Sequence, residues 1–179
     1  DKSIKLSKIP INILIRPRGG NFHFNNNEID KMFESINNFK KFNIKGFVIG
    51  FLDASNNLDP KILEEFRGQT SGYDLTFHRA FDYLVDQTKS LELLIENKFD
   101  RILCSGSKID SEKGLENLIN LKEIANDKIT IMPGGGINSK NFNLFKESGF
   151  QQIHLSGINK KISLDSDYNI IKEIIEMSK

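Results

Sequence analysis

Two arginines follow the apolar run Ile11–Ile15, at the position where a strand of a sheet would end. A guanidinium group offers a planar set of N–H donors that fits a phosphate or a carboxylate. Pro17 prevents a helix between Arg16 and Arg18, and Gly19–Gly20 lets a ligand approach the backbone closely. We therefore expect both arginines to contact an anionic ligand. A structural arginine that bridges to a loop carboxylate would use the same donors, so this alternative stays open.

A histidine, an arginine and an aspartate follow a second apolar run, in the segment TFHRAFD at Thr76–Asp82. The imidazole of His78 is suited to act as a general acid or base near neutral pH, or as a metal ligand. Asp82 is close enough in sequence to orient that imidazole or to pair with Arg79. With Arg16 holding an anionic group, His78 and Asp82 would be the catalytic residues. The alternative is a buried histidine inside an ion-pair network.

Three consecutive glycines, Gly134, Gly135 and Gly136, follow another apolar run. Glycine frees backbone N–H groups to face an anion, and the start of a helix predicted from Ser139 would add a positive end. We expect Ser156 and Gly157 to complete a phosphate-binding cradle with these glycines, and Arg79 to contribute its guanidinium group. The alternative is that the glycines only allow the backbone to turn sharply.

Short apolar runs alternate with longer amphipathic stretches, and this periodicity indicates the elements that must position these residues. The predicted strands are Ile11–Ile15, Gly46–Phe51, Tyr73–Phe77, Arg101–Cys104, Ile129–Met132 and Gln152–Leu155. The predicted helices are Asn27–Phe42, Pro60–Phe66, Thr88–Asn97, Gly114–Asn126, Ser139–Ser148 and Tyr168–Met177. Strict alternation implies parallel strands with helical crossovers. Because polar residues follow nearly every strand, we expect a barrel whose strand ends share one rim.

The period of two along a strand predicts which side chains face the inside of this barrel. They are Arg16, Thr76, His78 and His154. Asp59 before Pro60 is typical of a helix start, and Gly149 is typical of a helix end.

The composition limits the class of protein. A length of 179 residues with 38% hydrophobic content predicts one domain over residues 1–179. The formal net charge of +1 and the mixing of basic with acidic residues argue against a nucleic-acid partner. No apolar run approaches the roughly 20 residues that span a bilayer, and one cysteine fits a reducing compartment. We expect a cytoplasmic protein with no membrane partner.

Five segments resemble the CutC copper-homeostasis family, in the same order and spacing. They read IRPRGGNF, TFHRAFD, RILCSG, IMPGGG and HLSG, at Ile15–Phe22, Thr76–Asp82, Arg101–Gly106, Ile131–Gly136 and His154–Gly157. The resemblance covers essentially the whole chain. It implies a TIM-like (β/α)8 barrel and a link to copper homeostasis.

The family pattern begins with two further strands, rich in acidic residues and cysteine, that this sequence does not contain. About six βα units are then present, and the domain is expected to be incomplete at its N-terminal side. Six strands would leave two open edges, and open edges invite pairing with another chain. We expect either a missing N-terminal segment or a homo-oligomer that covers these edges.

The resemblance implies copper, and the sequence offers few donors for it. Cu(I) prefers thiolate and thioether ligands, and Cu(II) prefers imidazole. Cys104 together with Met132 and either His78 or His154 could form a weak site at neighbouring strand ends. The sequence has no CxxC pair, no methionine-rich run and no paired histidine motif. A buried cysteine acting as a small hydrophobic residue is the alternative for Cys104.

Three functions are therefore open from the sequence. The first is a CutC-like protein of copper homeostasis that binds copper weakly. The second is a barrel enzyme, an isomerase, lyase or hydrolase, that acts on a small phosphorylated or anionic metabolite with His78 as acid or base. The third is a binding protein without catalytic activity and with a degenerate site.

Overall fold

The computed structural model describes residues 2–158 and 166–179. Its centre is a five-stranded sheet in the order β1-β2-β3-β4-β5, and every neighbouring pair is parallel. The strands are β1 (Asn12–Leu14), β2 (Gly46–Ile49), β3 (Asp74–Phe77), β4 (Arg101–Cys104) and β5 (Thr130–Pro133). Sequential order with parallel pairing is the arrangement expected of a barrel wall, and five of the six predicted strands are confirmed.

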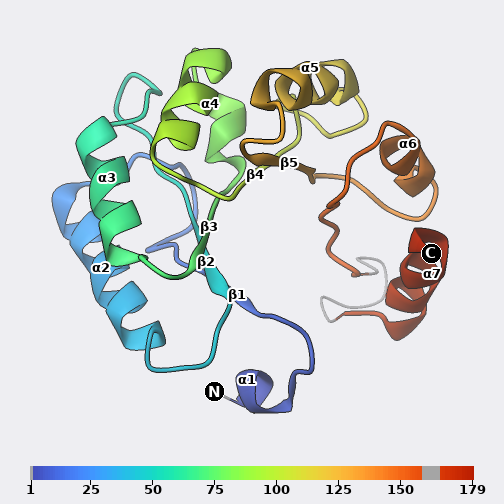
Figure 1. Cartoon of the computed structure of the whole chain (residues 1–179), viewed down its shortest axis with the longest axis horizontal. Coiled ribbons are helices and arrows are strands. Elements are labelled where there is room, and N and C mark those ends of the chain that lie inside the picture. Colours follow the sequence, from blue (N-terminus) through green and yellow to red (C-terminus); the bar gives the residue numbers. More distant parts are fainter. Residues whose placement is uncertain (1, 159–165) are drawn as a thin grey trace.

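Helices lie outside the sheet, and the whole forms an open arc whose two ends face each other across a gap (Figure 1). The α-helices are α1 (Lys2–Leu6), α2 (Asn26–Phe39), α3 (Pro60–Gln69), α4 (Gln87–Glu96), α5 (Leu115–Ala125), α6 (Phe142–Glu147) and α7 (Tyr168–Ser178). A 3-10 helix, η1 (Arg79–Tyr83), directly follows β3. The periodicity did not predict α1 or η1. Within the described ranges, no helix is long and apolar enough to span a membrane.

Local signals set several helix ends as predicted. Asp59 caps α3, because its side chain accepts hydrogen bonds from the backbone N–H groups of Lys61 and Ile62, and Pro60 occupies the first turn. Gly149 closes the turn after α6 with a φ of 76°, in the left-handed region that glycine tolerates best.

The predicted helix Ser139–Ser148 is shorter than expected and begins only at Phe142. The Asn138 side chain donates to the Gly136 carbonyl at 3.0 Å, and the Asn138 backbone N–H donates to the Asn141 side chain at 2.8 Å. These side-chain bonds hold the segment in a turn, because asparagine competes with the helix for backbone groups.

The sixth predicted strand, Gln152–Leu155, is wrong as a strand. The segment runs beside β5 and makes a single parallel bridge, between Gly134 and His154. The backbone N–H of His154 donates to the Pro133 carbonyl at 2.8 Å. No further strand among the described residues pairs with its other side, so a ladder does not build up.

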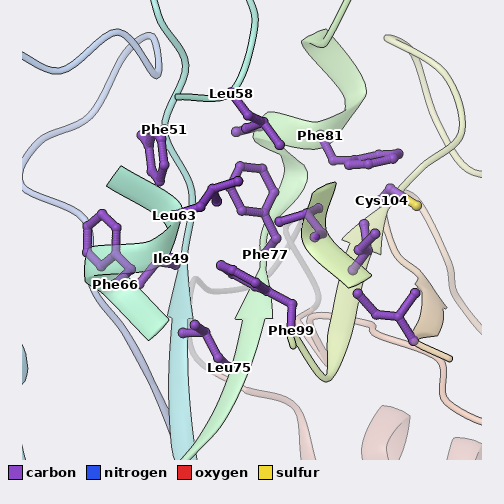
Figure 2. Close-up of a cluster of buried hydrophobic side chains, with 14 of the residues drawn as sticks. Ile49, Phe51, Leu58, Leu63, Phe66, Leu75, Phe77, Phe81, Phe99 and Cys104 are labelled. Atoms are coloured by element: carbon purple, nitrogen blue, oxygen red, sulfur yellow. The ribbon is translucent and has the colours of Figure 1, made fainter. Parts of the chain in front are cut away.

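The hydrophobic core lies between the sheet and its outer helices. Leu75 and Phe77 of β3 are fully buried, and Phe77 packs edge-on against Phe99 with ring centroids 6.0 Å apart. Figure 2 shows this cluster between the strands and the helices. Phe66 of α3 and Phe51 after β2 stack at 5.4 Å. Truncating such a buried ring to alanine costs roughly 3–5 kcal/mol, so the outer layer holds the strands in place.

Side chains alternate across each strand, and this alternation creates the inner face of the arc. In β3, Thr76 and the following His78 line the inner side while their neighbours enter the core. Leu14 of β1 also points inward and is 58% exposed. The inner face is therefore polar or open where the outer face is packed, as the sequence predicted for the Thr76 and His78 pair.

Candidate functional site

The inner face of the arc holds a cavity of about 560 Å³. Its walls are the inward side chains of β1 to β5, the loop after β1, and the segment that follows Phe150. The lining residues are Asn12, Leu14, Arg16, Phe22, Val48, Thr76, His78, Arg79, Arg101, Leu103, Met132, Gln152 and His154. A cavity of this volume is within the usual range for a small-molecule site.

Arg16 enters this cavity from the end of β1, as period-2 alternation predicts. One terminal nitrogen of its guanidinium donates to the Gly20 carbonyl at 2.5 Å, and the Cζ atom lies 4.6 Å from the centre of the Phe22 ring. The Nε atom is buried, and no described residue accepts its hydrogen bond. Stacking on Phe22 holds the guanidinium plane while leaving one donor unused.

His78 lies beside Arg16, and backbone groups fix its ring. The backbone N–H of Ala80 donates to Nδ1 at 3.1 Å, so the imidazole caps η1. The Phe22 ring lies 5.0 Å from the imidazole. The Nε2 atom is buried and has no hydrogen-bond partner in the described part of the chain.

Gly50 is required for this placement of the imidazole. A Cβ atom on Gly50 would lie only 2.2 Å from Nδ1 and 2.3 Å from Cε1 of His78. Contacts this short do not occur between real atoms, so any larger residue at this position would displace the ring. The sequence contained no signal for this pairing, because it depends on the register between β2 and β3.

Burial, followed by the positive charge of Arg16, lowers the pKa of His78 from 6.5 to about 4. His78 is only 6% exposed, which explains why desolvation is the larger cause. The imidazole is therefore neutral at pH 7. We call Arg16 Nε–H and His78 Nε2–H the open donors, because they are the two buried donors of the cavity for which residues 2–158 and 166–179 supply no acceptor.

Arg79, Asp82 and Ser105 form a closed network at the same rim. Arg79 Nε donates to Asp82 Oδ2 at 2.8 Å, and an Arg79 terminal nitrogen donates to Ser105 Oγ at 2.9 Å. The backbone N–H and the hydroxyl of Ser105 donate to the two oxygens of Asp82, each at 2.8 Å. Of the two partners predicted for Asp82, the structure selects Arg79 and not His78. Arg79 lines the cavity, and two of its five N–H donors are used in this network.

The glycine segment packs against this network. Gly135 has a φ of 130°, and a Cβ on it would lie 3.0 Å from an Arg79 nitrogen. A Cβ on Gly134 would lie 3.0 Å from the Cβ of His154, so the glycine segment and His154 are neighbours. Close approach therefore explains both glycines. The short helix α6 starts at Phe142, too far along the chain to add the expected helix N-terminus after Gly136.

The second half of the predicted cradle lies elsewhere. Ser156 is exposed and does not line the cavity. Gly157 is buried with a φ of 60°, and a Cβ on it would lie 2.9 Å from Ile171 of α7. Gly157 thus allows α7 to pack closely, and the structure does not bring these two residues to the cavity.

Arg18 is a structural arginine, the alternative that the sequence left open. Its Nε donates to Glu28 at 2.6 Å, and a terminal nitrogen donates to the His23 carbonyl at 2.7 Å. Two hydrogen bonds lower the pKa of Glu28. The larger effect comes from the backbone N–H of Asn25 and the smaller from the Arg18 side chain. Arg18 does not line the cavity, so the prediction that it contacts a ligand is wrong. Its hydrogen bonds instead hold the loop after β1 in place.

The predicted copper ligands come together only in part, since His78, Met132 and His154 line the cavity and Cys104 does not. Cys104 is fully buried on the outer face of β4, in the hydrophobic cluster of Figure 2, while Arg101 and Leu103 face the cavity. Burial, and then the nearby Asp82 carboxylate, raise the pKa of the Cys104 thiol, so it stays protonated. The predicted copper site of Cys104 with His78 or His154 is therefore wrong, because the sheet separates the thiol from the inner face.

His154 lines the cavity next to the bridge with Gly134. The residue is exposed, but the neighbouring groups still remove part of the water around the imidazole. This desolvation, and then the positive charge of Arg79, lower the pKa of His154. The predicted inward direction of His154 is confirmed. The described residues contain no cluster of three histidine, cysteine, aspartate or glutamate side chains that could bind a metal ion.

Sequence reasoning missed two residues of the site. Arg101 donates to Asp74 at 2.7 Å and to the Gln152 side chain at 2.8 Å, which ties the last wall of the cavity to the sheet. The second residue is Phe22, which contacts both Arg16 and His78. Alternation with the buried Ile102 could have placed Arg101 on the inner face, but nothing local indicates that Phe22 folds back over the site.

A parallel sheet whose strands lead to outer helices, with a cavity on its inner face lined by polar and apolar side chains, defines an α/β barrel of the (β/α)8 class. A solved aldolase, QR15, has this architecture with a TM-score of 0.70 over 98% of this chain and 81% of its own. At 17% identity, the likeness extends to the fold alone.

Closer similarities identify the family. The model of the CutC family matches residues 1–159. A CutC family protein from Bacteroides fragilis is 36% identical over 152 residues, which cover 84% of this chain and 61% of its own length. One from Pasteurella multocida is 36% identical over 162 residues, covering 90% of this chain and 66% of its own. The chain belongs to the CutC family, and it spans about three fifths of the length of the first of these relatives.

A crystal structure supports the same assignment. The CutC protein from Streptococcus agalactiae, named for copper homeostasis, superposes with a TM-score of 0.79. Its sequence is 34% identical, and the match covers 86% of this chain and 75% of that one. The predicted family and barrel fold are therefore confirmed.

Proposed function

We propose that the cavity binds a small anionic metabolite and that Arg16 is its anchor. The observation that carries this proposal is the pair of open donors on adjoining walls of one cavity. A buried donor without an acceptor costs about 1–3 kcal/mol, and a ligand oxygen would recover much of that cost. The two donors belong to one permanently charged group and one neutral group, a combination that favours an anion without binding cations.

The rest of the cavity suits a ligand with an apolar part. Val48, Leu103 and Met132 form an apolar wall between the polar ends. Phe22 stacks on Arg16 and contacts His78, so this ring lies beside both residues that carry the open donors. A small organic anion would place its charged end at Arg16 and its carbon atoms against this wall.

The link to copper rests on the family and on the naming of the Streptococcus agalactiae protein. The donors of this chain do not fit a copper centre. Copper favours a thiolate or several imidazoles, whereas Cys104 is a buried thiol on the outer face and Nδ1 of His78 accepts a backbone bond. We therefore propose that any role in copper homeostasis depends on the anionic ligand and not on a metal held by Cys104.

Isothermal titration and thermal shift with a panel of phosphorylated and carboxylated metabolites test the anion site. We expect at least one member to stabilise the wild type and to lose roughly tenfold or more in affinity in Arg16→Ala, since a hydrogen bond to a charged group contributes about 1.5–3 kcal/mol. Lys61→Gln is the matched control, because Lys61 carries the same charge on the exposed side of α3. Equal binding by Arg16→Ala and Lys61→Gln would refute the anchor.

A further inference from the structure

The hydrogen bond from Ala80 determines which nitrogen of His78 carries the proton. A neutral imidazole has one N–H and one bare nitrogen, and a nitrogen that accepts a backbone N–H must be the bare one. Nδ1 accepts from Ala80 at 3.1 Å, and the same edge of the ring lies against Gly50. The proton of the neutral ring is therefore on Nε2.

We infer that His78 presents a fixed Nε2–H donor to a carbonyl or anionic oxygen of the ligand and is neither a general base nor a metal ligand. The inference rests on the anion site proposed above and names the role of one of its two donors. A general base needs a bare nitrogen facing the ligand, and so does a metal ion. In this site the bare nitrogen faces the backbone, and the protonated nitrogen is the one left without an acceptor among the described residues.

Two neighbouring features keep the imidazole in this form. Arg16 is close enough to act on His78 electrostatically, and its permanent positive charge opposes a second proton on the ring. The ring is also nearly fully buried, which penalises the imidazolium further. A donor that stays neutral polarises a ligand oxygen without giving up its proton at neutral pH.

The open donors also indicate the chemical class of the ligand. One N–H comes from a guanidinium and one from an imidazole, and Phe22 contacts both groups. Two N–H groups on residues that line one cavity match the two oxygens of a carboxylate, or the carboxylate and the carbonyl of an oxo acid. A phosphate would offer more acceptor oxygens than these two donors satisfy. We therefore expect an organic carboxylate rather than a phosphate ester.

The first experiment measures the tautomer directly. Protein with ¹⁵N-labelled imidazole rings is studied by long-range ¹H–¹⁵N correlation at pH 7, and the chain has three histidines, so single substitutions of His23, His78 and His154 assign the signals. We expect Nε2 of His78 to show the shift of a protonated nitrogen and Nδ1 that of a bare nitrogen. The Nδ1–H tautomer or an imidazolium would overturn the inference, whether or not any anion binds.

The second experiment adds acetate, pyruvate and inorganic phosphate to the labelled wild type. We expect the His78 Nε2–H proton to move downfield with pyruvate or acetate, and to move less with phosphate. If a probe binds with Arg16-dependent affinity while the Nε2–H signal stays unchanged, the anion site stands and the inference about His78 fails. If none of the probes binds, the anion site is refuted for these classes of ligand. The tautomer measurement then still decides whether Nε2 of His78 carries the proton.

Substitution separates a donor from a base. His78→Gln keeps an N–H donor without a titratable group, whereas His78→Ala has neither. We expect Gln to retain several times more affinity for the probe than Ala, with both variants folded by circular dichroism. Equal loss in Gln and Ala, with the wild-type tautomer as predicted, would show that Nε2–H does not contact the ligand. His23→Gln is the control, because His23 bonds to Asn56 outside the cavity.

Discussion

Two groups of polar residues line the same cavity and differ in how far their hydrogen bonds are satisfied. Arg79, Asp82 and Ser105 form a network in which both carboxylate oxygens accept hydrogen bonds. The open donors on Arg16 and His78 have no acceptor within the described ranges. Both groups follow strand ends and contain an arginine.

The difference separates a structural part of the rim from an available part. A network in which both carboxylate oxygens are used holds backbone segments together, since Asp82 links η1 to the residue that follows β4. The open donors make no hydrogen bond to residues 2–158 or 166–179 that would account for their burial. Substitutions in the first group should therefore lower stability, and substitutions in the second should lower ligand binding.

The largest effect is expected for Asp82→Ala. Its carboxylate is buried and accepts from Arg79 and twice from Ser105, so its loss leaves the Nε–H of Arg79 and the backbone N–H of Ser105 without their acceptor. Breaking a buried pair in this way costs about 3–5 kcal/mol. Urea denaturation measures the change, with Asp30→Ala on the exposed side of α2 as the control. A loss as small as in the control would mean that the network is not structural.

Gly50→Ala is expected to connect the two groups by displacing His78. The new methyl group would overlap Nδ1 and Cε1, and overpacking costs roughly 1–3 kcal/mol. We place this change near the upper end, with loss of the protonated Nε2 signal of His78. Gly68→Ala is the matched control, because nothing lies within 4 Å of its new Cβ and it is in helix α3. There a gain of about 0.5–1 kcal/mol is expected from helix propensity.

Acid should destabilise the protein through His78. The folded pKa of about 4 lies below the ordinary value of 6.5, so the unfolded chain takes up a proton first as the pH falls. The stability that His78 supports is present above pH 6.5 and is lost as the pH falls toward 4. Between pH 7 and 5 the wild type should lose about 2 kcal/mol more than His78→Gln in urea denaturation. An identical pH dependence in both proteins would contradict the buried neutral imidazole.

The smallest effect is expected for copper uptake on changing Cys104. Since the thiol is buried on the outer face, Cys104→Ala should leave the stoichiometry of bound copper unchanged when the metal is titrated and measured by native mass spectrometry. The residue should also resist thiol reagents until the protein unfolds. Loss of one equivalent of copper in Cys104→Ala would restore the cysteine as a ligand.

The periodicity of the sequence predicted much of the fold and part of the candidate site. The alternation of apolar runs with amphipathic stretches predicted five of the strands, and the period of two placed Thr76, His78 and Arg16 on the inner face. Asp59 before Pro60 predicted the start of α3. These features depend on neighbours within a few positions, so they are readable before the chain folds.

The choice of hydrogen-bond partner was not readable in this way. The sequence offered two partners for Asp82, two roles for Arg18 and two roles for Cys104. In each case it left both open or favoured the wrong one. Arg18 donates to Glu28, and Asp82 accepts from Ser105, which is 23 positions further along the chain. Cys104 is buried in the core.

The sequence by itself determined which side chains face the inside of the barrel, because backbone geometry imposes that alternation on every strand. Only the tertiary structure decided which of those side chains are already satisfied. That outcome depends on strand register and loop closure, which bring Ala80 and Gly50 against one edge of His78 and leave the other edge with its proton. The open donors, and the function proposed for them, follow from that long-range arrangement.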